Sequence, residues 1–123
     1  MFSRDRPADG AVRIIRAYAA GSITTNRETL TRSAIVCAES VADWPPATVE
    51  AIAAAHVELL LALAPEVVLI GTGAKLRMPH AEALAVAHAR RIGIEVMDTA
   101  AACRTYNVLL SESRRVVAGL LMI

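Results

Sequence analysis

The sequence predicts an α/β protein built on a mixed, largely parallel sheet, with an antiparallel β portion at its N-terminal side. Over the second half of the chain, short continuously apolar runs alternate with segments of helical periodicity in the order β-α-β-α-β. The first half instead holds short β-like runs separated by tight turns, a pattern typical of antiparallel strands. With 123 residues, of which 55% are hydrophobic, the chain is large enough to fill one core.

The start of the chain is polar, so residues 1–11 are predicted to be a flexible lead-in and residues 12–123 a single domain. No apolar run follows the N-terminal charges, so no secretory signal is expected. The most hydrophobic stretch, Leu59 to Ile70, is interrupted by Pro65, whereas a membrane-spanning helix needs about 20 apolar residues. The chain is therefore expected not to span a membrane and to reside in the cytoplasm.

Three strands are predicted near the start of the domain, at Val12–Tyr18, Ser22–Thr25 and Glu28–Cys37. Gly21 separates the first two, and Asn26 begins a tight turn between the second and third because Asn tolerates positive φ. The end of the third strand is continuously apolar, which is typical of a strand covered on both faces.

The first helix is predicted after a Trp-Pro-Pro segment. Apolar side chains recur at helical spacing over Val49–Leu63, with Thr48 placed as the N-cap and Pro65 as the stop. His56 falls on the apolar face of this helix and is expected to be a hydrogen-bonded core residue.

Two further helices and three strands complete the chain. The second helix is predicted over Pro79–Ile92, with Gly93 just after its C-terminus. The third begins at Asp98 or Thr99, whose side chains can cap it, and continues to Leu110. The strands are predicted at Glu66–Ile70, Ile94–Met97 and Arg115–Leu121. Strands that alternate with helices of this length imply right-handed crossovers and parallel pairing.

In an open α/β sheet, ligands bind beyond the carboxyl ends of the strands. Two segments with unusual residues follow such strand ends, residues 71–77 and residues 98–107, and they are expected to be neighbours in space. The candidate ligand or interaction residues in them are Gly71, Thr72, Gly73, Lys75, Arg77, Cys103, Arg104, Thr105 and Asn107.

The first of these segments starts with Gly-Thr-Gly. A dinucleotide fingerprint needs a third glycine where this chain has Leu76, and a P-loop needs Gly before its lysine, whereas Lys75 follows Ala. The glycines are therefore interpreted as permitting a turn. The alternative is an anion held by Lys75 and Arg77 near a helix start.

Cys103 also has two interpretations. Its position early in a helix, beside Arg104, would lower the pKa of a reactive thiol, but buried cysteines in helices are common packing residues. No histidine is placed in sequence to act as its base, and the histidines and cysteines match no metal-ligand spacing. No catalytic residue, metal or cofactor is therefore predicted.

Composition narrows the classes of partner. The 13 basic and 12 acidic residues are interspersed and leave a formal net charge of +1, whereas nucleic-acid binders carry a clustered basic excess. Aromatic residues make up only 3% of the chain, which argues against a platform for stacking bases. Nucleic acid is not expected to bind. Trp44 is a candidate interaction residue that either anchors a partner protein or plugs the core at the sheet edge.

A longer pattern joins these segments. In chain order it consists of Gly71-Thr72-Gly73, Pro79, Glu95-Val96-Met97, Thr99, Ala102 to Leu109 and Glu112 to Arg114. With this pattern, the chain resembles a small-domain family of unknown biochemical activity, found in bacteria and archaea, that includes the mitochondrial assembly factor for respiratory complex I (NADH:ubiquinone oxidoreductase). The similarity covers about residues 12–121, with Trp44 also in its expected place, and the Thr-Tyr-Asn-Val-Leu block is its specific part.

The resemblance implies a three-layer α/β fold without an established set of catalytic residues. In mitochondria the related protein works with a partner protein at the inner membrane, and some bacterial relatives are linked with membrane-protein export or insertion. The chain is accordingly expected to be a non-enzymatic assembly or interaction protein with a protein partner, in the cytoplasm or peripheral at the inner membrane. Whether it forms a homo-oligomer is left open.

The alternative function is a small-molecule or anion-binding protein, or a thiol enzyme that uses Cys103, with its site at the carboxyl edge of the sheet. One departure from the family pattern lies at Ser113, where the family has glycine. Glycine there would suit a left-handed residue at the end of the third helix. Ser113 is expected either to bear that strain, on the order of 1 kcal/mol, or to end the helix differently.

Overall fold

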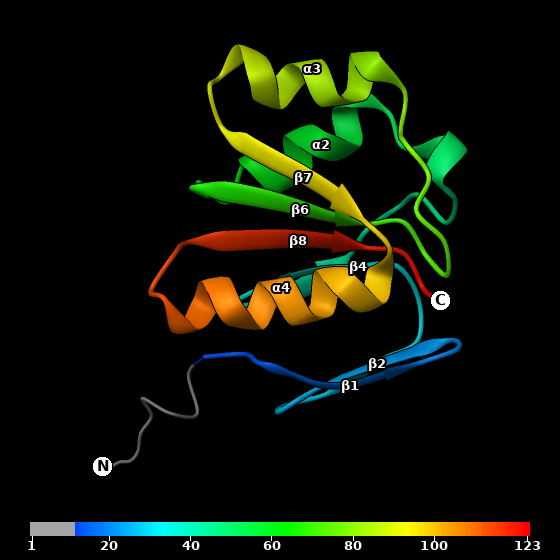
Figure 1. Ribbon diagram of the computed structural model, residues 1–123, viewed down its shortest axis with the longest axis vertical. Coiled ribbons are helices and arrows are strands. Elements are labelled where there is room, and N and C mark those ends of the chain that lie inside the picture. Colours follow the sequence, from blue (N-terminus) through cyan, green and yellow to red (C-terminus); the bar gives the residue numbers. More distant parts are fainter. Residues whose placement is uncertain (1–11) are drawn as a thin grey trace.

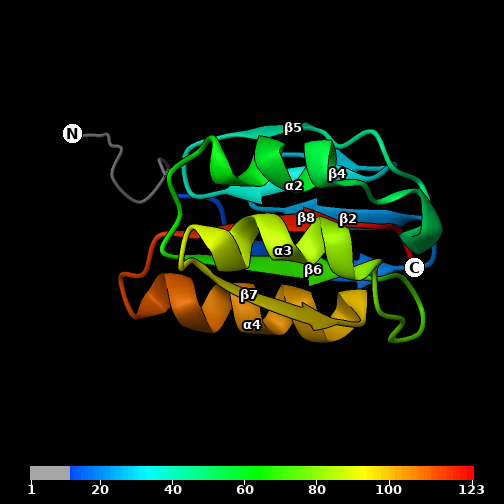
Figure 2. The ribbon, with the colours of Figure 1, turned by 90° about the horizontal axis from the view of Figure 1, so that it is seen from above.

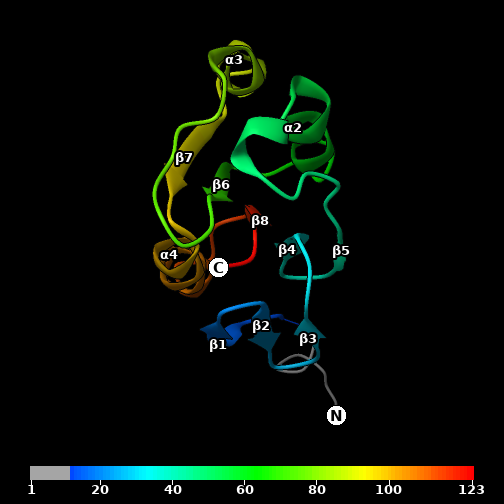
Figure 3. The ribbon, with the colours of Figure 1, turned by 90° about the vertical axis from the view of Figure 1, so that its right-hand side faces the viewer.

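The computed structural model describes residues 12–123, and the lead-in predicted for residues 1–11 lies outside the described residues. A five-stranded sheet forms the middle layer (Figure 1). Helices α2 (Ala54–Leu61) and α3 (Ala81–Ala89) cover one of its faces. Helix α4 (Thr99–Ser111) and a small three-stranded sheet cover the other face (Figure 3). The predicted three-layer α/β fold is confirmed.

The strands of the central sheet are β4 (Ala34–Cys37), β5 (Val41–Asp43), β6 (Val67–Gly71), β7 (Gly93–Met97) and β8 (Val116–Leu120). Their spatial order is β5-β4-β8-β6-β7. Strands β6, β7 and β8 run parallel, and β4 and β5 are antiparallel additions. Every residue of β4, β6 and β8 is buried, because both faces of these strands are covered. The predicted β-α-β-α-β unit is therefore the β6-to-β8 part of this sheet.

The small sheet consists of β1 (Ile15–Ala19), β2 (Ser22–Thr25) and β3 (Thr29–Leu30), which pair antiparallel. The prediction of one strand over Glu28–Cys37 is wrong, because the chain leaves the small sheet after β3 and enters the central sheet as β4. The exposed side chain of Arg32 lies in the connection between them. Strand β5 was not predicted, since only three residues pair there and most of them are exposed.

The predicted helix over Val49–Leu63 is wrong in its first third. The chain forms a 3₁₀ turn, η1 (Val49–Ala51), and α2 begins only at Ala54. Thr48 precedes the turn, but its side chain makes no capping hydrogen bond. Because α2 starts later than predicted, its apolar side chains do not all face the core. Val57, Leu60 and Leu61 are buried, and Leu59 and Leu63 are exposed.

His56 lies in the first turn of α2 and is partly exposed, so the expectation of a core histidine is corrected. Its Nδ1 accepts a hydrogen bond from the backbone N–H of Ala53 at 2.9 Å. Its carbonyl oxygen accepts one from the indole N–H of Trp44 at 3.1 Å. The residue therefore satisfies an otherwise unpaired amide at the helix start and fixes the orientation of the indole.

Helix α3 falls within the predicted segment but begins and ends differently. Pro79 precedes the helix, whose N-cap is His80. Arg91 has a φ of 57° and takes the left-handed position after the helix, whereas Gly93 is the first residue of β7. The prediction of Gly93 at that position is wrong by two residues, because the tight turn into β7 starts immediately after the last helical turn.

Both ends of α4 follow the sequence. The Oδ1 atom of Asp98 accepts a hydrogen bond from the backbone N–H of Ala101 at 2.9 Å, which confirms Asp98 as the N-cap. Ser113 has a φ of 62°, and its N–H donates to the carbonyl oxygen of Leu110 at 3.0 Å. Ser113 therefore bears the left-handed strain that glycine would avoid.

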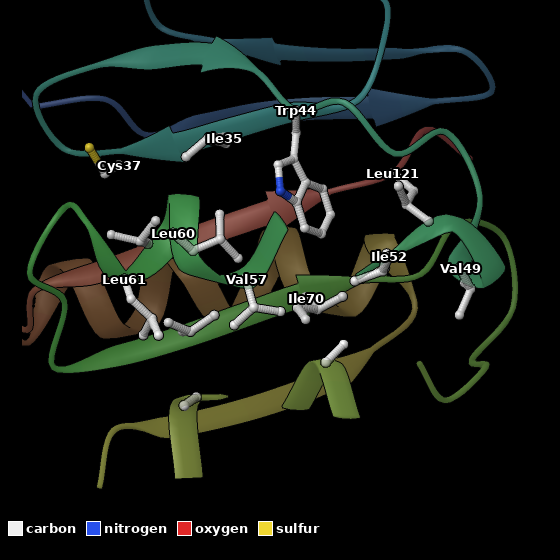
Figure 4. Packing of buried hydrophobic residues seen from close by; sticks show 14 residues of the cluster. Ile35, Cys37, Trp44, Val49, Ile52, Val57, Leu60, Leu61, Ile70 and Leu121 are labelled. Carbon is white, nitrogen blue, oxygen red and sulfur yellow. The ribbon is translucent and has the colours of Figure 1, made fainter. Parts of the chain in front are cut away.

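Two apolar clusters lie on the two faces of the central sheet. Trp44, which is 2% exposed, fills the cluster under α2 and η1 (Figure 4). The indole lies against the backbone of β8 at Gly119, where an added Cβ would come within 2.9 Å of the ring. The structure thus places Trp44 in the core, and its ring is not available as a surface anchor.

Candidate functional site

Three parallel strands end side by side at the carboxyl edge of the central sheet. Gly71 of β6 lies in register with Met97 of β7 and with Leu120 of β8. Beyond the strands, the N–H of Thr72 donates to the Met97 carbonyl at 2.9 Å, and the N–H of Leu121 donates to the Gly71 carbonyl at 2.9 Å. The predicted Gly-Thr-Gly segment therefore begins where the three strands stop.

Thr99, at the start of α4, ties these strand ends together. Its side chain is fully buried, and its hydroxyl donates to the Leu121 carbonyl at 2.7 Å while accepting from the N–H of Gly73 at 2.8 Å. The backbone N–H of Thr99 donates to the Gly73 carbonyl at 2.9 Å. A Cβ at Gly71 would lie 2.9 Å from the Thr99 hydroxyl oxygen, and Gly73 has a φ of 98°. Both glycines are required by the turn, which agrees with their interpretation from sequence.

The loop after this turn, residues 74–78, is ordered by Thr72 and exposed at its tip. The Thr72 hydroxyl donates to the Lys75 carbonyl at 2.6 Å and accepts from the N–H of Arg77 at 3.3 Å. Leu76 and Met78 expose 58% and 64% of their surfaces. Neither residue is among the candidates predicted from the sequence, because their exposure follows from the absence of a neighbouring element in the fold.

A shallow hollow of about 320 Å³ lies beside the 74–78 loop. The turn contributes Thr72 and Gly73 to its lining, and the loop contributes Lys75 and Arg77. The opposite wall comes from residues 47–50 and from residues 121 and 122 after β8. Arg77 forms an ion pair with Glu50 across this hollow. Among the described residues that line the hollow, only Lys75 therefore offers a positive charge that no described carboxylate pairs with.

Cys103 lies away from this hollow, on the face of α4 that packs against the sheet, and is 1% exposed. Burial raises the pKa of its thiol to about 11, and the nearby charge of Arg104 lowers it only in part. A thiol in this environment is protonated at neutral pH and has no path to a substrate. The packing interpretation of Cys103 is the one that its surroundings favour.

The residues after Cys103 hold the small sheet in place. The Asn107 side-chain amide accepts from the N–H of Ile15 at 2.9 Å and donates to the carbonyl of the same residue at 2.7 Å. The Tyr106 hydroxyl donates to the Arg13 carbonyl at 2.7 Å. The specific block that carries the family resemblance therefore includes the contacts that fasten β1 to α4.

The remaining candidates on α4 are peripheral to these contacts. Arg104 is exposed, and its guanidinium donates to the Tyr18 hydroxyl at 2.8 Å. Thr105 is partly buried. The structure thus joins residues 71–77 to the start of α4 through Thr99, but the hollow at that edge contains no residue of the Cys103–Asn107 segment. The two candidate segments do not form one pocket.

Within residues 12–123, no group of three or more His, Cys, Asp or Glu side chains is arranged to hold a metal ion. In the same part of the chain, no helix combines the length and the apolar character needed to cross a bilayer.

The raised pKa of Cys103 predicts slow alkylation. Since the folded-state pKa of about 11 lies above that of an exposed cysteine, the thiolate fraction near pH 8 should fall roughly 100-fold, and burial should slow the reaction further. Reaction with iodoacetamide, followed by peptide mass spectrometry, should leave Cys103 unmodified in the native protein and modify it within minutes in guanidinium chloride. Rapid native labelling of Cys103 would contradict the packing role.

The sequence of this chain is similar to a known family and to proteins of other organisms. Residues 15–121 match a family described as a protein of unknown function, DUF498/DUF598. An NADH dehydrogenase [ubiquinone] 1 alpha subcomplex assembly factor 3 from Danio rerio is 33% identical over 110 residues, which are 88% of this chain and 63% of that protein. The chain thus spans less than two thirds of that relative. A 13 kDa major membrane protein of Francisella tularensis subsp. holarctica is 37% identical over 68 residues, 55% of either chain.

A solved structure has the same fold. The crystal structure of a protein from Bordetella parapertussis superposes with a TM-score of 0.88 at 38% sequence identity, covering 95% of this chain and all of that one. The fold of this chain is therefore shared with that bacterial protein.

Proposed function

The chain belongs to this family of unknown function, and from that premise we propose that it is a non-enzymatic assembly protein that binds a protein partner during the building of a respiratory or other membrane protein complex. Its place of action is the cytoplasm, next to the inner membrane. The support for this proposal is the relationship to a protein named as an assembly factor of NADH dehydrogenase and to one named as a membrane protein.

The single observation that carries the proposal is the exposure of Leu76 and Met78. They are the most exposed large hydrophobic side chains in the described part of the chain, and they sit on an ordered loop. Large apolar side chains that a monomer leaves in water, with a cationic rim such as Lys75, are the composition expected of a partner-binding surface. The anion-binding alternative has less support, because Arg77 is already paired with Glu50.

The test is affinity capture, with cross-linking, of the tagged full chain from its native cells. The Leu76→Ser/Met78→Ser double variant should recover the partner at least about tenfold less well than wild type, because each buried apolar side chain contributes about 1.5–3 kcal/mol. A matched control is Leu59→Ser/Leu63→Ser, since these residues of α2 and of the turn after it are also exposed apolar side chains but lie away from the loop. The control should recover the partner as well as wild type.

Unfolding midpoints of both double variants should equal that of wild type, since all four positions are exposed. Wild-type capture that returns no protein reproducibly would contradict the assembly function. Partner recovery that is equal for wild type and the Leu76→Ser/Met78→Ser variant would contradict the loop as its surface.

A further inference from the structure

Most free strand edges of this fold are blocked. The outer edge of β1 is occupied by the Asn107 amide, which bonds both backbone groups of Ile15, and a bulge follows between Ile15 and Ala17. Strand β3 has only two residues. Strand β5 has three residues, and its Asp43 forms an ion pair with Arg32 at 3.0 Å. Short strands, bulges and edge charges are the usual means of preventing unwanted pairing.

Strand β7 is the exception. Within residues 12–123 it pairs only with β6, over five residues in unbroken parallel register. It contains no proline, lysine or bulge, and its one charged residue is Glu95. In Figure 2, β7 runs between α3 and α4, and no strand of the described residues pairs with its second edge. A regular, mostly apolar edge of this length is a template for another strand.

The hydrogen bonds between β6 and β7 show which backbone N–H and C=O groups of β7 are not used by β6. The N–H of Thr72 donates to the Met97 carbonyl, so Met97 directs its backbone groups toward β6. In a parallel ladder this direction alternates along the strand, so Ile94 and Val96 direct their N–H and C=O groups outward. Among residues 12–123, no hydrogen bond reaches these groups. Two donors and two acceptors are thus presented in a straight row.

The side chains of β7 give this edge two different flanks. Those of Ile94 and Val96 are partly buried against the α2–α3 cluster, so the α3 side of the edge is apolar. The side chain of Glu95 is exposed and points to the opposite side, toward the α4 layer. An incoming strand would therefore meet an apolar flank on one side and a carboxylate on the other.

We propose that the β7 edge binds an extended segment of the partner protein, in which apolar residues facing α3 alternate with basic residues facing Glu95. This inference rests on the proposed function, of which it specifies the binding mode. A second copy of the chain fits less well. The antiparallel two-fold pairing that uses all four free groups places Glu95 opposite Glu95, and like charges directly opposite each other are destabilising. A strand with lysine or arginine at that position is complementary.

The edge also continues into the 74–78 loop. Thr72, which is bonded to the end of β7, orders that loop through its hydroxyl. In Figure 1 the loop extends beyond the carboxyl end of β7. A partner segment paired with β7 would leave the strand next to Leu76 and Met78, so one partner could contact both surfaces.

The test uses two short capped peptides, one of alternating valine and lysine and one of alternating valine and glutamate, with isotope-labelled full-length protein. Amide hydrogen exchange followed by NMR reports directly on the N–H groups of Ile94 and Val96. The valine–lysine peptide at millimolar concentration should slow their exchange at least about tenfold. The valine–glutamate peptide should leave it unchanged.

Two variants separate backbone pairing from charge. Val96→Pro removes one outward N–H that β6 does not use, a change that an edge strand tolerates, and it should abolish protection of Ile94 by either peptide. Glu95→Gln keeps every backbone group and should make the two peptides protect equally. Because Glu95→Gln alters only an exposed side chain, it keeps the proposal testable even if the proline variant does not fold.

Three results would overturn the proposal. The first is protection of the two amides by neither peptide, the second is equal protection by both peptides in the wild-type protein, and the third is protection of the amides in a free protein that sediments as a dimer. The last result would assign the edge to a second copy. None of them bears on whether capture depends on Leu76 and Met78, so the proposed function and its binding mode fail separately.

Discussion

Replacement of Trp44 by alanine should cost about 3–5 kcal/mol of unfolding free energy. The indole is almost completely buried, packs on Gly119 and donates a hydrogen bond to the His56 carbonyl. Its removal leaves a cavity between α2 and the central sheet and removes the hydrogen bond that the indole adds to the His56 carbonyl. Since a domain of this size has a total stability of about 5–15 kcal/mol, urea-induced unfolding should show a midpoint shifted far toward low denaturant.

A substitution at Gly119, on which the indole of Trp44 packs, tests whether this contact stabilises the fold. Gly119→Ala would force a methyl group into the ring and should cost about 1–3 kcal/mol in the wild-type background. In the Trp44→Ala background the same methyl group enters a cavity, so its cost should vanish or change sign. A double-mutant cycle should therefore give a coupling of more than about 1 kcal/mol. Additive effects of the two changes would show that the ring does not press on β8.

Most of the α/β unit was predictable because its local signals agree with its tertiary contacts. The apolar runs of β6 and β8 are buried on both faces, as their composition requires. Asp98 caps α4 by a contact within its own turn, which depends on nothing distant. Ser113 has the left-handed conformation for the same reason, since the helix end is closed by local backbone hydrogen bonds.

The errors lie where tertiary contacts override a local pattern. Val49 and Ile52 have helical spacing with His56, but the backbone at Ile52 and Ala53 is extended. The side chains of Val49 and Ile52 are instead buried with Trp44 in the cluster under α2. A continuous helix over that segment would turn other residues toward the sheet. The division of the Glu28–Cys37 segment between two sheets has a similar cause, because only its second half is buried on both faces.

The candidate site was predictable in part. Strand order places residues 71–77 and the start of α4 at one edge of the sheet, and Thr99 joins them there. Sequence spacing does not tell which side of a helix a motif faces. Asn107 was consequently predicted to be part of the same site, whereas its side chain contacts the backbone of Ile15. The exposure of Leu76 depends on the absence of a neighbouring element, which no local pattern reports.

The fastening of β1 by Asn107 leads to the second large expected effect. In Asn107→Asp, a carboxylate oxygen replaces the NH₂ group that donates to the Ile15 carbonyl. One hydrogen bond is lost and a charge faces a carbonyl oxygen, so the variant should lose roughly 2–4 kcal/mol at neutral pH. Amide hydrogen exchange should show the loss in β1 and β2 first, because the small sheet can separate locally while the central sheet remains folded.

The pH dependence of this variant distinguishes the contact from a general packing defect. Only the protonated carboxyl can donate to the Ile15 carbonyl, so the folded-state pKa of the new group should lie above its unfolded value of about 3.9. Stability lost at neutral pH should therefore return below about pH 4 relative to Asn107→Ala, and disappear again as the pH rises through the folded-state pKa. Arg104→Ala, which removes an exposed contact from the same helix to the same strand, should change stability by less than about 0.5 kcal/mol. Equal losses for Asn107→Asp and Asn107→Ala at every pH would show that the amide does not hold β1 through this hydrogen bond.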